Sequence, residues 1–375
     1  MRLGIVISAY NRRGGLERVA VEYARGLVAR GHEVVVFAQT WEVQDEDRAV
    51  RFVRVGGLRS QIALRAATFP FAAARAVARV DLDNIVSFGS VLSRPCVVRL
   101  PGAHRSWWEV ANREWPVTTF DGLRRRLNPH HHIILASDRH VLGRGIPSAV
   151  LAAGDWAADE IRFYYPAVVD KVRVLPDGVN LEEFSFDPKG RETMRAAWEV
   201  GDSPLLFTVA TEMRRKGLGT LFESFRVIRE RVPDARLVVA GRAPAGDVRA
   251  LAVAHRLGRE VRAVGFVPDL RAAYSAADAL IFPTRFDPWG LPIAESLACG
   301  TPVAVSARAG AAAAVTDGVN GALIPDPTDP VGVAHAAVRA LSLPSDRAGA
   351  RASVEHLRWE NVVAQLEQVL EQTAL

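Results

Sequence analysis

Cysteine and long apolar runs are scarce in this sequence, and their scarcity excludes several classes of protein. The 375 residues include two cysteines, Cys96 and Cys299, with no CxxC or Cys/His spacing. A disulfide framework and a structural zinc site are therefore not expected, and a reducing compartment, the cytoplasm, fits best. Arginines interrupt even the alanine-rich stretch 64–80, so no apolar run of about 18 residues predicts a membrane span. The apolar N-terminus lacks a small-residue cleavage site and is interpreted as a first buried strand.

The remaining composition is that of an ordinary folded protein with an uneven charge. Hydrophobic residues make up 49% and charged residues 24% of the chain, and the length favours two domains. Residues 1–180 contain 25 Lys and Arg against 18 Asp and Glu, whereas residues 181–375 contain 22 against 24. The basic half favours an anionic partner, such as a phosphorylated acceptor, a lipid surface or nucleic acid. The alternative explanation is Arg-rich codon usage without any anionic partner, since arginine carries nearly all of the positive charge.

A β–loop–α–β pattern occurs once near the N-terminus and again from about residue 205. The first copy has a strand at 3–9, a helix at 16–30 and a strand at 33–37. Further short apolar runs alternate with helical patterns, which predicts parallel sheets covered on both faces. The runs expected as strands are 85–88, 96–100, 133–136, 149–152 and 172–175, then 261–264, 279–283, 302–305 and 322–324.

The predicted fold is therefore α/β, with two doubly wound, Rossmann-like domains facing across a cleft. Ligands of such domains bind beyond the carboxyl ends of the strands, so the cleft is the expected active site. Residues 1–180 are assigned to the first domain and 181–354 to the second, with a linker within 176–204, where Pro, Gly, Asp and Asn cluster. Residues 355–371 are expected to form an amphipathic helix, and 355–375 are assigned to the first domain.

The pair Gly14-Gly15 lies between the first strand and the first helix, where backbone N–H groups and the helix N-terminus favour an anion. A turn that needs glycine for steric reasons alone is the other interpretation. A dinucleotide site requires G-x-G-x-x-G and an acidic residue after the second strand, whereas this chain has NRRGGLER and then Ala38-Gln39-Thr40. NAD binding is therefore not expected.

The second half contains a basic loop and an acidic loop. The basic loop, 213–217 (MRRKG), lies between a strand and a helix, so its cations should reach the carboxyl edge of the second sheet and neutralise a leaving diphosphate. A solvated charged surface is the alternative. Asp287 and Glu295 flank the start of a predicted helix, where ionised carboxylates suit sugar or ribose hydroxyls. A glycosidase carboxylate pair is a weaker interpretation.

The segment from Asp287 through Glu295 to ACGTPV resembles the E-x7-E signature of the retaining glycosyltransferases of family 4, which have the two-domain GT-B fold. GGL after the first strand, PDGVN at 176–180, RKG at 215–217 and GFV at 265–267 follow in the family's order and approximate spacing. The resemblance thus extends over nearly the whole chain. GGLER with RRKG is most similar to the enzymes that add glucose to the lipopolysaccharide inner core.

The resemblance implies a role for each matching residue. Glu295 would hold the donor's ribose hydroxyls, and Arg215 and Lys216 would bind its diphosphate. His104 resembles the family's histidine near the transferred sugar, with a core or surface histidine as the alternative. The other residues implied to contact the donor are Gly15 at the phosphates and sugar, Gly265, Phe266 and Val267 beside the base, and Asp287, Trp289, Gly290 and Leu291 at the sugar hydroxyls.

Two departures from the family pattern bear on the choice of donor sugar. Asp287 stands where the family has Glu, one methylene longer, and the loop 309–315 (AGAAAAV) stands where many members have Gly-Gly and Glu. Asp81 and Asp83 form an Asp-x-Asp that resembles the metal motif of other glycosyltransferases. Because it directly precedes a strand, it is interpreted as structural, and neither a metal nor another cofactor is expected.

Residues 99–132 combine six Arg, four His and three Trp with three acidic residues. This mixture suits a phosphorylated glycolipid head group or an anionic membrane surface, and hence a peripheral location at the inner face of the cytoplasmic membrane. A mixture of core Trp and solvated Arg is the alternative. No nucleic-acid-binding motif accompanies the segment, so nucleic acid is not expected as a partner.

The sequence thus predicts a retaining, metal-independent glycosyltransferase that moves a hexose, by resemblance from UDP-glucose, to a cell-envelope glycan or lipid-linked acceptor. In retaining members the donor phosphate is thought to take the acceptor proton, so no protein nucleophile is expected. Arg215 and Lys216 would stabilise the leaving diphosphate. A nucleotide-sugar 2-epimerase, which needs no acceptor, and a non-catalytic nucleotide-sugar sensor stay open.

Overall fold

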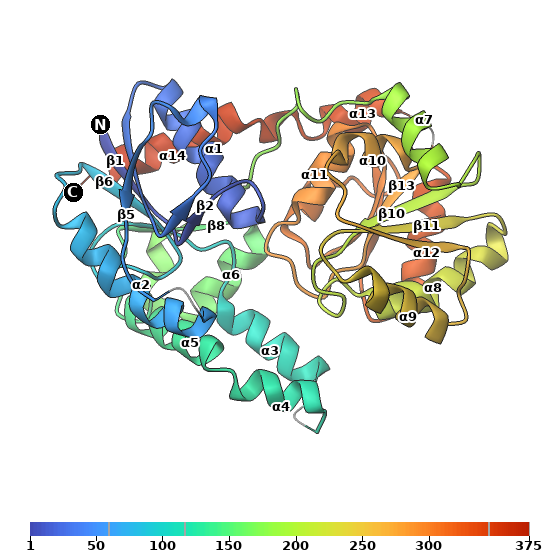
Figure 1. Ribbon diagram of the computed structural model, residues 1–375, viewed down its shortest axis with the longest axis horizontal. Helices are drawn as coiled ribbons and strands as arrows, with labels where there is room; N and C mark the ends of the chain where they lie inside the picture. Colours follow the sequence, from blue (N-terminus) through green and yellow to red (C-terminus); the bar gives the residue numbers. More distant parts are fainter. Residues whose placement is uncertain (59–60, 116–117, 344–345, 375) are drawn as a thin grey trace. The chain divides into compact units, whose positions relative to one another are not determined.

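The computed structural model describes residues 1–58, 61–115, 118–343 and 346–374. The chain divides into two compact units, unit 1 with Met1–Gly178 and Trp359–Leu375, and unit 2 with Val179–Arg358. Each unit is a parallel sheet with helices on its faces (Figure 1). Within the described ranges, no helix has the length and apolar character that crossing a membrane would need.

The described part of unit 1 is built on a seven-stranded parallel sheet with the order β5-β3-β1-β6-β7-β8-β9. Its inner strands are mostly continuous apolar runs rather than alternating ones, because helices bury both faces, whereas the edge strands contain arginines and are partly exposed. The short strands β2 and β4, which follow β1 and β3 in the chain, pair in parallel as a separate two-stranded sheet. The bounds are β1 (Arg2–Val6), β2 (Ala9–Tyr10), β3 (Glu33–Ala38), β4 (Thr40–Trp41), β5 (Arg51–Arg54), β6 (Asn84–Phe88), β7 (Val97–Arg99), β8 (Ala149–Ala152) and β9 (Val172–Val174).

Helices from both ends of the chain cover one face of this sheet. The last helix, α14, packs beside α1 (Figure 1), and a Cβ on Gly26 would lie 2.5 Å from the Val363 side chain, so glycine allows the two helices to touch. The opposite core includes residues of α2, α5 and α6. The bounds are α1 (Gly15–Ala29), α2 (Ile62–Val77), α3 (His104–Glu114), α4 (Phe120–Leu127), α5 (Pro129–Val141), α6 (Asp155–Tyr164) and α14 (Trp359–Gln372), with 3-10 turns at Asp45–Asp47 and Pro166–Lys171.

Two predictions about individual elements are wrong in detail. Residues 133–136 form no strand but lie inside α5, because Pro129 occupies its first turn and the Asn128 side chain accepts a hydrogen bond from His130 N at 3.0 Å. Residues 355–371 are not one helix. A 3-10 turn covers Glu355–Leu357, Arg358 is extended with ψ 140°, and α14 begins only at Trp359.

The described part of unit 2 has a six-stranded parallel sheet with the order β12-β11-β10-β13-β14-β15. Helix α7 lies within the segment that the sequence analysis assigns to a linker. The strands are β10 (Leu205–Val209), β11 (Arg236–Ala240), β12 (Val261–Gly265), β13 (Ala279–Phe282), β14 (Val303–Ser306) and β15 (Gly321–Ile324). The helices are α7 (Pro188–Ala197), α8 (Leu218–Arg231), α9 (Ala245–Ala254), α10 (Leu270–Ala276), α11 (Leu291–Ala298), α12 (Pro330–Leu341) and α13 (Arg347–Ala352), with 3-10 turns at Gly310–Ala314 and Glu355–Leu357.

The order of the strands in unit 2 determines where its loops meet. β10 pairs with β11 on one side and with β13 on the other, so the strand order reverses at β10. Loops that leave the carboxyl ends of two strands at such a reversal lie side by side and leave room for a ligand. The basic loop follows β10 and the acidic loop follows β13.

Candidate functional site

The basic and acidic loops of unit 2 contact each other through a buried ion pair. Lys216 Nζ donates to Asp287 Oδ2, and the two residues are 8% and 9% exposed. Arg215 Nη1 lies 3.9 Å from the same oxygen and donates to the Phe286 carbonyl at 3.2 Å. The structure therefore brings together three of the residues that the sequence analysis selects, two cations and one carboxylate.

Backbone contacts fix the relative position of the two loops. Arg285 N donates to the Arg215 carbonyl at 2.8 Å, and Thr284 Oγ1 donates to the same carbonyl at 3.1 Å. Gly217 begins α8 as its N-cap with a φ of +70°, and a Cβ there would lie 2.2 Å from the Pro283 carbonyl oxygen. Both the left-handed backbone and the close approach require glycine at the end of RRKG.

Burial and the opposite charge of the partner act in opposite directions on the pKa values of Asp287 and Lys216. Burial raises the pKa of Asp287, but the charges of Lys216 and Arg215 outweigh burial and hold that pKa below its ordinary value. Burial lowers the pKa of Lys216, and Asp287 opposes this effect by favouring the ammonium. Lys216 Nζ also lies 4.3 Å from the ring centroid of Phe282, a further stabilising contact for a desolvated cation.

The acidic loop leads directly into α11. Asp287 lies in the loop before the helix, as predicted, and its Oδ1 accepts a hydrogen bond from Trp289 N at 3.3 Å. Gly290 is the N-cap of α11, with a φ of +92° and no side-chain cap bond, and Leu291 is the first helical residue. The sequence-predicted sugar contacts thus form one continuous turn, and the Trp289 side chain itself is buried.

The alanine-rich loop 309–315 packs under this turn. Gly310 N donates to the Asp287 carbonyl at 3.2 Å, and Ala311 N donates to the Trp289 carbonyl at 2.8 Å. A Cβ on Gly310 would lie 2.2 Å from the Pro288 carbonyl oxygen, so glycine is required at this contact. The departure from the family pattern in this loop therefore coincides with close backbone packing against the acidic turn.

Glu295 lies in the second turn of α11 and is 2% exposed. Its Oε2 accepts a hydrogen bond from the Tyr274 hydroxyl at 2.7 Å, and Tyr274 is completely buried in α10. The sequence analysis did not select Tyr274, because a single tyrosine within the apolar run of α10 carries no signal of its own.

The residues expected beside the base lie at the edge of the sheet in unit 2. Gly265 ends β12, and its carbonyl accepts a hydrogen bond from Gly241 N at 2.8 Å, while β11 separates β12 from β10. Phe266 is 70% exposed and Val267 is buried. This segment lies at the same carboxyl edge of the sheet as Lys216 and Asp287, two strands away from β10.

Gly15 and His104 belong to unit 1, so the fold of unit 2 does not position them. Gly15 is the first residue of α1, and the Glu17 carboxylate lies against Gly14, with Oε2 2.0 Å from where a Gly14 Cβ would be. His104 is the first residue of α3, and its Nε2 lies 3.0 Å from His131 Nδ1. Burial, with smaller effects of neighbouring histidines, lowers the pKa of His104 to about 4.

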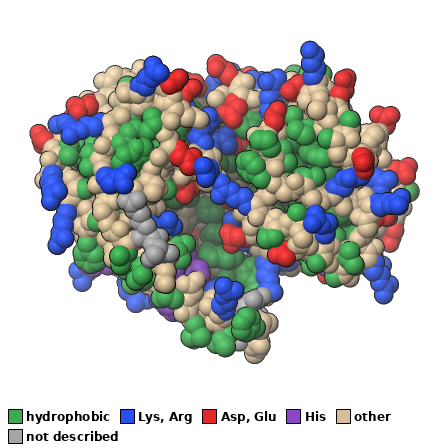
Figure 2. Space-filling model, in the orientation of Figure 1, with side chains coloured by type: hydrophobic (Ala, Val, Ile, Leu, Met, Phe, Trp, Pro, Cys, Tyr) green, Lys and Arg blue, Asp and Glu red, His purple; other side chains and the backbone are tan. Residues whose placement is uncertain are grey.

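The basic segment 99–132 divides into a buried part and an exposed part. Arg99 is completely buried, pairs with Asp177 and donates to the Leu175 carbonyl at 2.7 Å, so it belongs to the core and not to a basic surface. On α4, large apolar side chains are exposed next to arginines, and Figure 2 shows hydrophobic and basic side chains together in this region. These apolar residues are Phe120, Leu123 and Leu127, which are 80%, 47% and 70% exposed.

The Asp-x-Asp segment has a structural contact. Asp83 Oδ2 accepts a hydrogen bond from Arg2 N at 2.7 Å, which ties the start of β6 to β1. In the ranges that the structure describes, no three His, Cys, Asp or Glu residues are grouped in a way that could hold a metal ion.

Two family models match the chain, one in each unit. The model described as "Glycosyltransferase Family 4" matches residues 13–183, and the model described as "Glycosyl transferases group 1" matches residues 203–342. A D-inositol 3-phosphate glycosyltransferase of Xylanimonas cellulosilytica is 28% identical over 96% of this chain and 92% of that protein. A GDP-mannose-dependent alpha-(1-6)-phosphatidylinositol monomannoside mannosyltransferase of Mycolicibacterium smegmatis is 27% identical over 96% of this chain and 95% of that protein.

Solved structures match the whole chain as well. WaaG, a glycosyltransferase involved in lipopolysaccharide biosynthesis, has a TM-score of 0.79 at 21% identity, with 99% of both chains covered. HepE of Anabaena in complex with UDP and glucose has a TM-score of 0.74 at 16% identity, with 99% of this chain and 100% of that chain covered. The predicted GT-B fold of two Rossmann-like domains is thereby confirmed.

Proposed function

Because the chain belongs to the glycosyltransferases of family 4, we propose that it transfers a hexose from a nucleoside diphosphate hexose, with UDP-glucose as the first candidate, to a phosphate-bearing acceptor of the cell envelope. The observation that carries this proposal is the contact of Lys216 and Arg215 with Asp287 at the carboxyl ends of β10 and β13. It supplies positive charge for a diphosphate and a carboxylate for sugar hydroxyls at one edge of the sheet.

The proposed step needs no protein nucleophile. The acceptor oxygen forms a bond to C1 of the hexose while the bond from C1 to the diphosphate oxygen breaks. The acceptor proton passes to the leaving diphosphate on the same face, so the configuration at C1 is retained. Arg215 and Lys216 stabilise the charge that grows on the diphosphate, and the fixed loops mean that little reorganisation accompanies this change.

The donor site in this proposal is assembled from the basic and acidic loops, helix α11 and the end of β12, all in unit 2. Asp287 and the turn Trp289–Leu291 hold the sugar, Glu295 holds the ribose, and Gly265, Phe266 and Val267 border the base. The exposed Phe266 ring supports the last role, because an aromatic side chain in water at this edge offers a stacking surface. The proposed reaction requires neither a metal nor another cofactor.

The proposed acceptor carries phosphate and is presented at an anionic membrane surface. The names of the two relatives compared above refer to D-inositol 3-phosphate and to a phosphatidylinositol mannoside, both of which contain phosphate. The excess of arginine in residues 1–180 and the exposed apolar residues of α4 support a peripheral membrane location.

The donor is tested by thermal unfolding with UDP-glucose, UDP-galactose, UDP-N-acetylglucosamine, GDP-mannose, UDP, GDP and NAD, each with and without EDTA. A ligand at 100 times its dissociation constant adds about 2.7 kcal/mol to the free energy of unfolding. We expect stabilisation by one nucleotide family and none by NAD, with no effect of EDTA. Stabilisation by NAD alone, or by no nucleotide, would contradict the proposal.

Turnover of the stabilising donor then separates the three possible activities. A transferase releases nucleoside diphosphate only when acceptor extract is added, apart from slow hydrolysis. A 2-epimerase changes the donor without any acceptor, and a sensor leaves the donor unchanged.

Membrane association is tested by sedimentation with vesicles of phosphatidylglycerol and phosphatidylethanolamine. We expect binding at low salt that weakens as the salt concentration increases. The double variant Phe120→Ser with Leu127→Ser should bind several-fold more weakly than the native chain. Phe71→Ser, at another exposed phenylalanine of unit 1, is the matched control. Equal binding of both variants and the native chain would rule out α4 as the contact.

A further inference from the structure

We infer that Tyr274 is a positioning residue that holds the Glu295 carboxylate in place to receive the donor's ribose hydroxyls. The inference rests on the proposed function, which assigns Glu295 to the ribose. It adds a residue of α10, outside the basic and acidic loops, to the machinery of the donor site.

The direct evidence is a hydrogen bond inside the protein. The Tyr274 hydroxyl donates to Glu295 Oε2 at 2.7 Å, and the two residues are 0% and 2% exposed. A hydrogen bond to an ionised carboxylate is stronger than one between neutral groups, and more so where water is excluded. The bond therefore fixes the plane of the carboxylate before any ligand arrives.

The ring of Tyr274 is itself fixed by its neighbours. The Phe207 ring of β10 contacts it edge to face, with centroids 5.6 Å apart and an interplanar angle of 85°, and the Phe184 ring lies 6.1 Å away. Thr301 Oγ1 donates to the Tyr274 carbonyl at 2.8 Å. Ring and backbone of the tyrosine are thus held on three sides.

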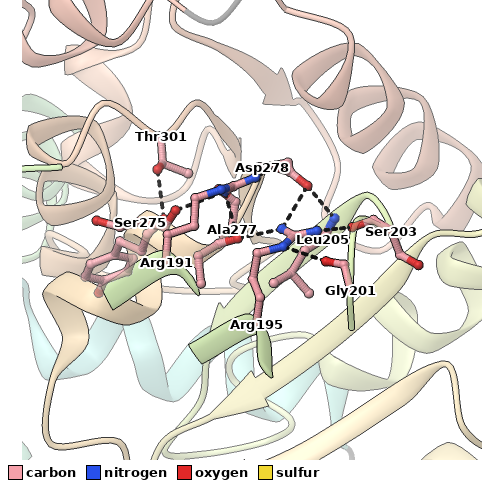
Figure 3. Close-up of polar contacts among 11 residues, drawn as sticks. Arg191, Arg195, Gly201, Ser203, Leu205, Ser275, Ala277, Asp278 and Thr301 are labelled. Carbon is pink, nitrogen blue, oxygen red and sulfur yellow. Dashed lines mark hydrogen bonds and ion pairs between the residues drawn. The ribbon is translucent and has the colours of Figure 1, made fainter. Parts of the chain in front are cut away.

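Two arginines of α7 hold the end of the helix from which Tyr274 projects (Figure 3). Arg191 Nη1 donates to the carbonyls of Ser275, Ala276 and Ala277 at 2.9–3.2 Å, and Arg195 Nη1 donates to the Ala276 carbonyl at 2.8 Å. These carbonyls at the C-terminal end of α10 lack partners within the helix. A seven-residue helix is not stable alone, so this support contributes to holding Tyr274 in position.

Asp278 completes the support. Its carboxylate accepts from Arg191 at 2.7 Å, and Oδ2 also accepts from Leu205 N at 2.8 Å, which attaches the α10 end to the first residue of β10. The contacts run from α7 through the end of α10 to Tyr274 and then to Glu295. A carboxylate fixed in this way loses less side-chain entropy when it binds a ligand.

The test measures how strongly the protein distinguishes ribose from deoxyribose. Dissociation constants are measured by calorimetry for UDP and GDP and for their 2′-deoxy and 3′-deoxy counterparts, and the deoxy-to-ribo ratio is compared between variants. In the native chain we expect a ratio of about ten or more, since hydrogen bonds to a charged group are lost. Tyr274→Phe should bring this ratio close to one while the affinity for the deoxy nucleotides stays unchanged.

The deoxy nucleotides make this readout specific to positioning. A general loosening of unit 2 in Tyr274→Phe would weaken ribo and deoxy nucleotides alike and leave the ratio unchanged, which would overturn the inference. Tyr23→Phe is the matched control, because Tyr23 is completely buried in unit 1 and its hydroxyl has no hydrogen-bond partner among the described residues.

Glu295→Gln distinguishes the positioning role of Tyr274 from the ribose role of Glu295 on which it rests. If Glu295→Gln loses the ribose preference and Tyr274→Phe keeps it, the positioning role of Tyr274 is refuted and the proposed function stands. If Glu295→Gln keeps the preference, or the native chain has none, the ribose role of Glu295 is refuted together with the inference.

Discussion

Removing either charge of the Lys216–Asp287 pair should destabilise unit 2, and removing both should cost no more than removing one. Lys216→Met preserves most of the side-chain volume but leaves a buried carboxylate, and Asp287→Asn leaves a buried ammonium. Breaking a buried ion pair costs about 3–5 kcal/mol. In Lys216→Met, Arg215 Nη1 stays 3.9 Å from the carboxylate and Trp289 N still donates to it. In Asp287→Asn, the ammonium keeps its contact with the Phe282 ring, and it can lose its proton because burial lowers its pKa. We therefore expect about 3 kcal/mol for each single variant.

The double variant distinguishes an ion pair from two independent contacts. If the pair is coupled, Lys216→Met with Asp287→Asn should also cost about 3 kcal/mol rather than about 6, which is a coupling energy of about 3 kcal/mol. Urea unfolding measures these free energies, fitted with a separate transition for each unit because two domains need not unfold together. Turnover should stay at least about a hundredfold lower in the double variant, because Lys216 is needed on the diphosphate.

An exposed pair provides the control for this cycle. Arg48 and Asp45 are 78% and 87% exposed, so their coupling energy should stay below about 0.5 kcal/mol. A coupling energy equally small for Lys216 and Asp287 would refute the buried pair. Native turnover in Lys216→Met would instead refute the role of Lys216 in catalysis, whatever its effect on stability. Lys189→Met, at an exposed lysine, is the control for the lysine substitution itself.

Two further predictions concern pH and a glycine. The pKa of His104 is lowered to about 4 by burial and that of Asp138 is raised by burial to about 6, so the free energy of unfolding should rise with pH because of His104 and fall because of Asp138. Between pH 4 and 6 the free energy of unfolding of the native chain should thus change little, because the two effects oppose each other. Over the same range it should fall by about 2 kcal/mol in His104→Asn and rise in Asp138→Asn, as measured by urea unfolding. A pH profile unchanged in both variants would contradict these pKa shifts. Gly217→Ala should cost at least about 2 kcal/mol and weaken nucleotide binding, whereas Gly219→Ala, where no atom lies within 4 Å of the added Cβ, should be neutral or stabilising; equal effects would contradict the packing of the two loops.

Much of the fold could be predicted because parallel strands are apolar runs that turn residues interrupt. This rule fails where an apolar run belongs to a helix. Residues 133–136 are an example, and there the stronger evidence was the Asn128-Pro129 start of α5. Helix α7 carries the same kind of signal, with Asp187 as N-cap and Pro188 in the first turn, in a segment whose composition indicates a linker.

The candidate site could be predicted where it depends on local motifs. Spacing along the chain placed Asp287 before a helix and the cations after a strand, and the order of the sheet then brought them together. Tyr274 could not be predicted, because its contact with Glu295 depends on how α10 packs against α11. Arg99 shows the same limit, since only the tertiary structure reveals that a residue from a basic segment is buried.

The packing of α14 beside α1 determines when unit 1 can fold during synthesis. The core of unit 1 contains Trp359, Val362, Val363, Leu366 and Leu370 together with residues of β1 and α1. During synthesis the ribosome must therefore complete all of unit 2 before unit 1 can close its core. Unit 1 begins first but cannot finish folding until the C-terminal helix has been made, and until then its sheet exposes an apolar face to chaperones, proteases and other nascent chains.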